Sequence, residues 1–129
     1  MKSTDKILFW TPRIIGILAI LFISMFALDA FDPRLSIGEQ ILAFLLHMIP
    51  SFVLIAVLLI AWRWEFVGGI IFAAIGLGMS PLIFMHNYLV NHFSILECVR
   101  VILLINLPFI VVGGLFIAHH YRTKKAIDE

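Results

Sequence analysis

Four long stretches without Asp, Glu, Lys or Arg occupy most of this chain: residues 14–28, 41–62, 66–88 and 101–121. Each is close to the roughly 20 residues that a helix needs to cross a hydrocarbon core of about 30 Å. Backbone groups in lipid must bond internally, so spans are helices or closed barrels, and these continuous apolar runs lack the alternation of barrel strands. The sequence therefore predicts an all-α polytopic membrane protein with four transmembrane helices in an antiparallel bundle.

The composition points to the same class of protein. Hydrophobic residues make up 63% of the 129 residues and charged residues only 13%, whereas a soluble domain has about 25% charged residues. A net charge of +1 from dispersed basic residues does not favour nucleic acid as a partner. The single cysteine, Cys98, excludes an internal disulfide and any CxxC motif, and is either a small apolar packing residue or a site of palmitoylation or redox sensing.

The spans are predicted at about 13–31, 40–62, 65–86 and 98–120 within a single domain, followed by a short cytoplasmic tail at 121–129. Of the nine Lys and Arg residues, only Arg34 and Arg100 fall on one side of these spans, and all others fall on the opposite side. The positive-inside rule then places both termini in the cytoplasm.

Two kinds of sequence pattern recur along the chain. Residues 10–16 and 62–68 both begin with Trp and have Gly six residues later, and a Leu-Leu pair precedes both Pro50 and Pro108. Either these are chance similarities between apolar segments, or the chain is a duplicated helical hairpin whose halves have the same orientation. The prolines within spans, which include Pro81, remove amide donors and predict kinks, with a gating or ligand-binding break as the alternative.

Small residues recur at helical spacing along the third predicted span. They are Gly69, Ala73, Gly76 and Ser80. Such a face lets a neighbouring backbone approach closely and gain dispersion contacts. We expect this face to be buried, and to serve as a contact surface if the protein is a homo-oligomer or binds another membrane protein.

A candidate polar cluster lies in the outer half of the predicted spans. Its members are Asp29, Glu39, His47, Arg100 and Asn106. Because an ionisable group inside a membrane is a functional hypothesis by default, these residues could form a proton or ion relay. In the alternative interpretation Asp29 and Glu39 are solvated residues at loop edges, Arg100 forms an ion pair, and His47 hydrogen-bonds across the bundle, for example to Asn106.

Histidines do not predict a cofactor here. His47, His86 and His119 are expected at different depths, which disfavours a haem held between two imidazoles. The spacing of His86, His92 and Glu97 matches no standard zinc pattern, and no nucleotide-binding or hydrolase motif is present. We therefore predict no cofactor, no metal site and no catalytic residue.

Several short motifs together suggest a family. They are WTPRIIGIL at 10–18, FALD at 26–29, HxIP at 47–50 and AWRWExxGG at 61–69. With these motifs, roughly the first two thirds of the chain resembles a family of small, uncharacterised prokaryotic membrane proteins with four spans. The resemblance implies a bacterial or archaeal inner membrane and no particular activity.

Two classes of function follow from these observations. The first is a non-enzymatic membrane protein that works through helix packing, as a homo-oligomer or an accessory subunit. The alternative is a small oligomeric transporter or channel that uses the outer polar cluster. In both cases we expect membrane lipid and other membrane helices as partners.

Overall fold

The computed structural model describes residues 2–129, which form six α-helices and one 3-10 helix and contain no β-strand. In chain order the elements are α1 (Ser3–Met25), the 3-10 helix η1 (Phe26–Ala30), α2 (Ile37–His47), α3 (Ile49–Arg63), α4 (Glu65–Leu89), α5 (Ile95–Ile105) and α6 (Leu107–Asp128). The predicted all-α class is confirmed over these residues. Helix α6 continues through most of the predicted tail.

Two of the four predicted spans are continuous. Residues Ser3–Ala30, which comprise α1 and η1, and residues Glu65–Leu89 of α4 are long and apolar enough to cross a membrane. The other two predicted spans are broken, because α2 meets α3 at a bend of 42° and α5 meets α6 at a bend of 41°. The chain thus has two candidate membrane spans, or four if each bent pair crosses as one.

Prolines account for the position of both bends. Pro50 lies in the first turn of α3, and Pro108 lies in the first turn of α6. Proline has no backbone N–H to donate, and its ring clashes with the carbonyl four residues earlier. It therefore suits the beginning of a helix and not its interior. Pro81 instead lies inside α4, which continues through it as one helix. Two of the three prolines predicted to kink a span therefore coincide with a bend.

Apart from η1, which belongs to the first half alone, the two halves of the chain share the same order of elements. Each half has a long helix, a loop, an 11-residue helix and a bent junction to a second long helix. Ser36 with Glu39 forms a capping box at the beginning of α2, and Ser94 with Glu97 does so at the beginning of α5. Each box satisfies two backbone amides that a helix start leaves unpaired. The two halves are therefore similar in the order of their long and short helices, in their capping boxes and in their bends.

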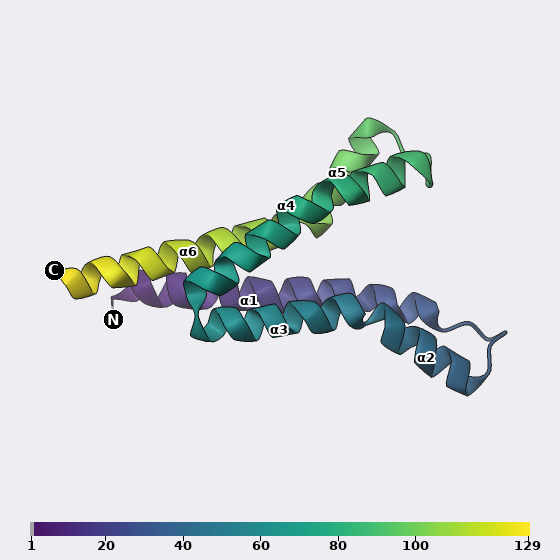
Figure 1. The fold of residues 1–129 in the computed structure, drawn as a ribbon, viewed down its shortest axis with the longest axis horizontal. Helices are drawn as coiled ribbons and strands as arrows, with labels where there is room; N and C mark the ends of the chain where they lie inside the picture. Colours follow the sequence, from purple (N-terminus) through teal and green to yellow (C-terminus); the bar gives the residue numbers. More distant parts are fainter. Residues whose placement is uncertain (1) are drawn as a thin grey trace.

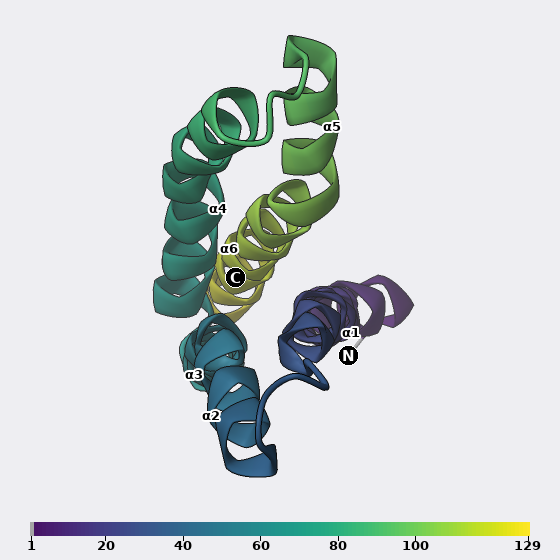
Figure 2. The same cartoon turned by 90° about the vertical axis from the view of Figure 1, so that its right-hand side faces the viewer.

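We call α1–α3 the first hairpin and α4–α6 the second hairpin. The two hairpins are joined at one end of the molecule and separated at the other. Both termini lie at the left in Figure 1, where α1 and α3 run beside α4 and α6. Toward the opposite end α2 and α5 move apart, and Figure 2 shows this separation from the side on which they lie. We call the end with the termini the closed end and the opposite end the open end.

Helices α4 and α6 form the centre of the packing. Phe72 of α4 stacks on Phe109 and Phe116 of α6, with ring centroids 6.1 and 6.3 Å apart. All three rings are buried, as is Val112. Close packing of these side chains gains dispersion contacts between the two helices.

The predicted small-residue face of α4 packs against α6 of the same chain. A Cβ atom added to Gly113 of α6 would lie 2.5 Å from the Gly69 carbonyl and 2.7 Å from the Ala73 amide. A Cβ atom on Gly76 would lie 2.6 Å from a side chain of α6, and Ser80 is hydrogen-bonded to the α5–α6 junction. This face is therefore occupied by α6 within the chain, and its role as a contact surface for another protein stays a prediction.

An exposed ion pair in the loop between η1 and α2 leads to a pH prediction. Arg34 donates to the Asp32 carboxylate from Nε at 3.0 Å and from Nη2 at 2.7 Å. These hydrogen bonds hold the pKa of Asp32 below its ordinary value of 3.8. Because the pKa of Asp32 is lowered in the folded protein, the pair stabilises the loop at pH values above the ordinary pKa of Asp32. This contribution is lost as the pH falls through the lowered pKa.

We expect Arg34→Gln to raise the pKa of Asp32 toward its ordinary value in an NMR titration of the Asp32 carboxyl carbon. The matched control is Arg100→Gln, which changes another exposed arginine at the open end and should leave the Asp32 titration unchanged. An Asp32 pKa that is the same in wild type and Arg34→Gln would contradict this assignment.

Candidate functional site

A buried arginine lies at the closed end of the molecule. Arg13 of α1 is 1% exposed, and its Nη1 donates to the Phe9 carbonyl one turn earlier. The guanidinium carbon lies 3.6 Å from the centroid of the Phe9 ring and 5.2 Å from the rings of Trp62 and Phe116. These distances are within the range of cation–π attraction. A charge buried this deeply also requires a hydrogen-bonded counter-charge.

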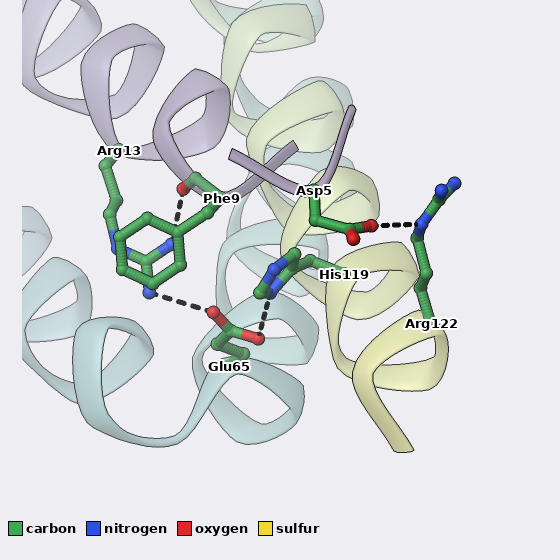
Figure 3. Close-up of polar contacts among 6 residues, drawn as sticks. All are labelled: Asp5, Phe9, Arg13, Glu65, His119 and Arg122. Carbon is green, nitrogen blue, oxygen red and sulfur yellow. Dashed lines mark hydrogen bonds and ion pairs between the residues drawn. The ribbon is translucent and has the colours of Figure 1, made fainter. Parts of the chain in front are cut away.

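Glu65 supplies this counter-charge and connects three helices (Figure 3). Its Oε1 accepts from Arg13 Nη2 at 2.8 Å, and its Oε2 lies 2.7 Å from Nδ1 of His119 in α6. An ionised carboxylate can only accept, so an ionised Glu65 accepts this bond from an Nδ1 that carries a proton. Glu65 is the first residue of α4, where the helix dipole favours a negative charge. The cluster of Arg13, Glu65 and His119 therefore joins α1 of the first hairpin to α4 and α6 of the second.

A second ion pair ties the same hairpins closer to the chain ends. Asp5 of α1 accepts from Nε of Arg122 in α6 at 2.6 Å, as Figure 3 shows. The pair is partly exposed, so it contributes less to stability than the buried cluster. Together the two sets of contacts explain why the hairpins stay together at the closed end.

A pocket of about 440 Å³ opens beside the cluster at the turn between α3 and α4. We call it the turn pocket; its lining consists of Phe9, Arg13, Trp62, Arg63, Trp64, Glu65, Phe66, Val67 and His120. Among the described residues, Nε of Arg13 is the buried side-chain donor that has no hydrogen-bond partner. The turn pocket thus combines aromatic walls with two arginines, one buried and one exposed.

A larger cavity of about 660 Å³ lies between the hairpins. We call it the apolar groove; α1, α3, α4 and the α5–α6 junction line it almost entirely with apolar residues, and Asn106 is the polar exception. Ala74 and Gly78 of α4 line this groove four residues apart and are exposed. A Cβ atom added to Gly78 would meet no atom within 4 Å. Unlike the face that contacts α6, this pair of small residues is open.

The five polar residues predicted as an outer cluster lie toward the open end but are not brought together. Asp29, Glu39 and His47 belong to the first hairpin, whereas Arg100 and Asn106 belong to the second, and the hairpins diverge there (Figure 1). All except Asn106 are exposed. Glu39 belongs to the cap of α2, and His47 Nδ1 hydrogen-bonds to a carbonyl of its own helix at 2.8 Å. Among these five described residues, no hydrogen bond or ion pair joins any two.

Asn106 holds the bent junction of the second hairpin to α4. Its Nδ2 donates to the Gly76 carbonyl at 3.3 Å and to the Ser80 hydroxyl at 3.0 Å. At the corresponding bend of the first hairpin, Ser24 of α1 donates to the Ser51 hydroxyl at 2.9 Å. Polar side chains near a helix break help to satisfy groups that lipid cannot bond. Asn106 is thus bonded to α4 and not to His47.

Sequence reasoning missed the buried cluster. In the sequence, Arg13 serves only as one of the basic residues that predict the orientation of the chain in the membrane. Glu65 only marks the turn before the third predicted span. A signal is nevertheless present, because the similarity between 10–16 and 62–68 aligns Arg13 with Glu65. These two residues carry opposite charges and meet where the two halves pack. His119 has no comparable signal, because its contact depends on the rotation of α6.

The chemistry available at the closed end is that of paired charges beside a cationic and aromatic pocket. The carboxylate of Glu65 is shared between a guanidinium and an imidazole, which compensates its charge. Within residues 2–129, no group of three or more His, Cys, Asp or Glu side chains is arranged to hold a metal ion. The residues at this site can therefore join helices through hydrogen bonds and ion pairs, and the arginines can bind an anion.

A family model described as "Domain of unknown function (DUF7670)" matches residues 1–128. The chain belongs to this family. The match extends over both hairpins, beyond the first two thirds that carry the sequence motifs. The expected membership of an uncharacterised family is confirmed. No curated protein and no solved structure matches the chain.

Proposed function

We propose that this protein is a non-enzymatic integral membrane protein of a prokaryotic inner membrane, and that it works by associating with a second copy of itself. Two of its helices are long and apolar enough to span a membrane, and two bent helix pairs are so if each pair crosses as one. Seven of the nine Lys and Arg residues belong to the closed end in the predicted topology, which supports cytoplasmic termini.

The open part of α4 is the observation that carries this proposal. Ala74 and Gly78 expose a small-residue pair to the apolar groove, and nothing covers Gly78. In lipid, close approach of backbones at such pairs is a main source of helix association. A contact between α4 and its symmetry mate would be isologous, which is the arrangement of the commonest homo-oligomers.

The buried polar residues support a packing role for the fold. Glu65 is bonded to both Arg13 and His119, and Asn106 is bonded to α4. The alternative function, a transporter or channel built on the outer polar cluster, depends on groups that lie on separate hairpins. Helix association is therefore the function that the geometry favours.

Cysteine cross-linking in native membranes tests this proposal. We expect Gly78→Cys to form a covalent dimer with a short thiol cross-linker, and Leu77→Cys to form little. Leu77 is the matched control because it is exposed at almost the same depth but does not line the groove. Wild type serves as the blank, since Cys98 is fully buried. Equal cross-linking at both positions, or none at Gly78→Cys, would refute self-association through this face.

A second variant separates association from folding. Gly78→Ile adds a bulky side chain where a Cβ atom meets nothing in the chain, so the monomer should fold normally. We expect it to convert a dimer to a monomer in nanodiscs, as measured by mass photometry. A dimer that survives this change, or a wild-type protein that is monomeric until a different membrane protein is added, would also count against the proposal.

A further inference from the structure

We propose that the turn pocket binds a phosphate group, and that the source favoured by its position is the headgroup of an anionic phospholipid. This inference goes beyond helix association, because it uses the α3–α4 turn at the closed end and none of the groove residues. The same chemistry could be satisfied by free phosphate from the cytoplasm, so the experiment distinguishes the two sources.

Two arginines provide the positive charge. Arg63 is exposed, forms no ion pair within the described residues and lies with its guanidinium carbon 5.9 Å from the centroid of the Trp64 ring. Arg13 is the buried residue of the lining, and its Nε–H remains without a partner after its other nitrogens bond Phe9 and Glu65. An unpaired buried donor is costly unless it finds an acceptor, and phosphate oxygens are strong acceptors.

The first turn of α4 provides further donors. Trp64 at its N-cap makes no side-chain cap, and the first intrahelical bond runs from the Gly68 amide to the Trp64 carbonyl. The amides of Glu65, Phe66 and Val67 therefore have no partner within the helix, and all three residues line the turn pocket. Such a helix start binds phosphate through its amides and its dipole.

Glu65 is the acidic residue in the lining and does not cancel this attraction. Its Oε1 accepts from Arg13 and its Oε2 from His119, so the carboxylate is compensated within the cluster. Arg63 then remains as the uncompensated charge at the pocket, with His120 as a further polar group.

The position of the turn pocket favours a lipid as the source. Trp62 and Trp64 are 40% and 59% exposed and flank Arg63 where two apolar helices meet. Tryptophan favours the headgroup level of a membrane, and basic pockets between helices on the cytoplasmic side bind anionic headgroups. A phospholipid can therefore place its phosphate in this pocket while its chains stay beside α3 and α4.

Native mass spectrometry of the detergent-purified full chain tests the inference, with phosphatidylglycerol and phosphatidylcholine as probes. We expect tighter binding of phosphatidylglycerol and a loss of about fivefold in its affinity in Arg63→Gln. Arg63→Lys, which keeps the charge, should restore most of the affinity. Lys124→Gln is the control, because it removes a basic residue from the same end that does not line the pocket.

The outcomes separate the possibilities. Equal binding of both lipids by wild type, or unchanged phosphatidylglycerol binding in Arg63→Gln, would overturn the phosphate site. Displacement of phosphatidylglycerol by millimolar inorganic phosphate, lost in Arg63→Gln, would support the site and assign it to free phosphate. Gly78→Ile should keep its lipid binding, and Gly78→Cys should still cross-link when it is combined with Arg63→Gln, so this inference and the proposed self-association fail independently.

Discussion

Replacing Glu65 with leucine is expected to lower the free energy of unfolding by about 3–5 kcal/mol, because the change leaves a buried charge without its partner. Arg13 is 1% exposed and would keep only the Phe9 carbonyl as an acceptor. His119 would lose its bond to the carboxylate as well. Unfolding in mixed detergent micelles, followed by tryptophan fluorescence, measures the change.

The double variant Arg13→Met with Glu65→Leu provides the internal control. Removing both charges leaves none unpaired, so most of the lost stability should return. Asp5→Asn breaks the partly exposed pair with Arg122 and should cost much less than Glu65→Leu. Additive losses in the double variant, or a loss below about 1 kcal/mol in Glu65→Leu, would show that the cluster does not hold the hairpins together.

Gly68→Val should destabilise the protein by about 3 kcal/mol or more, because the α3–α4 turn has no room for a side chain at this position. A Cβ atom on Gly68 would overlap the Cα, Cβ and amide nitrogen of Ala61 in α3. Ala61 is fully buried and its backbone belongs to a helix, so it cannot move aside cheaply. Overpacking usually costs about 1–3 kcal/mol, and a clash with backbone is at the upper end or beyond.

Two glycines in open space serve as controls for this substitution. A Cβ atom on Gly38 or on Gly114 would meet no atom within 4 Å, so Gly38→Val and Gly114→Val should change the free energy of unfolding by less than about 1 kcal/mol. The same unfolding measurement compares the three variants. Similar effects at all three positions would mean that helix propensity, and not the close approach of α3 and α4, controls the response.

The helical elements were largely predictable because their causes are local. Long apolar runs must bond their own backbone groups in lipid, which predicts helices without knowledge of any partner. Proline acts on the turn that precedes it, so Pro50 and Pro108 mark the bends within about two residues. The capping boxes at Ser36 and Ser94 are equally local signals, and they would have located the beginnings of α2 and α5.

The candidate site was harder to predict because it depends on contacts between distant parts of the chain. The sequence predicts a similar depth in the membrane for all the outer polar residues. A shared depth does not specify whether the two hairpins lie together or diverge at that depth. Arg13 and Glu65 are 52 residues apart, and Glu65 and His119 are 54 residues apart. Their meeting depends on how each helix is rotated about its axis, which periodicity does not specify in a helix that is apolar on all sides.

By itself the sequence determined an all-α chain with helices apolar enough for a membrane and with prolines at which kinks are expected. These features follow from backbone hydrogen bonding and proline geometry, which act within a few residues. Only the tertiary structure decided that the hairpins join at the closed end and that α6 packs on the predicted small-residue face of α4. It also decided that Ala74 and Gly78 stay open. Those features come from long-range packing, in which close contact between side chains on different helices selects one arrangement.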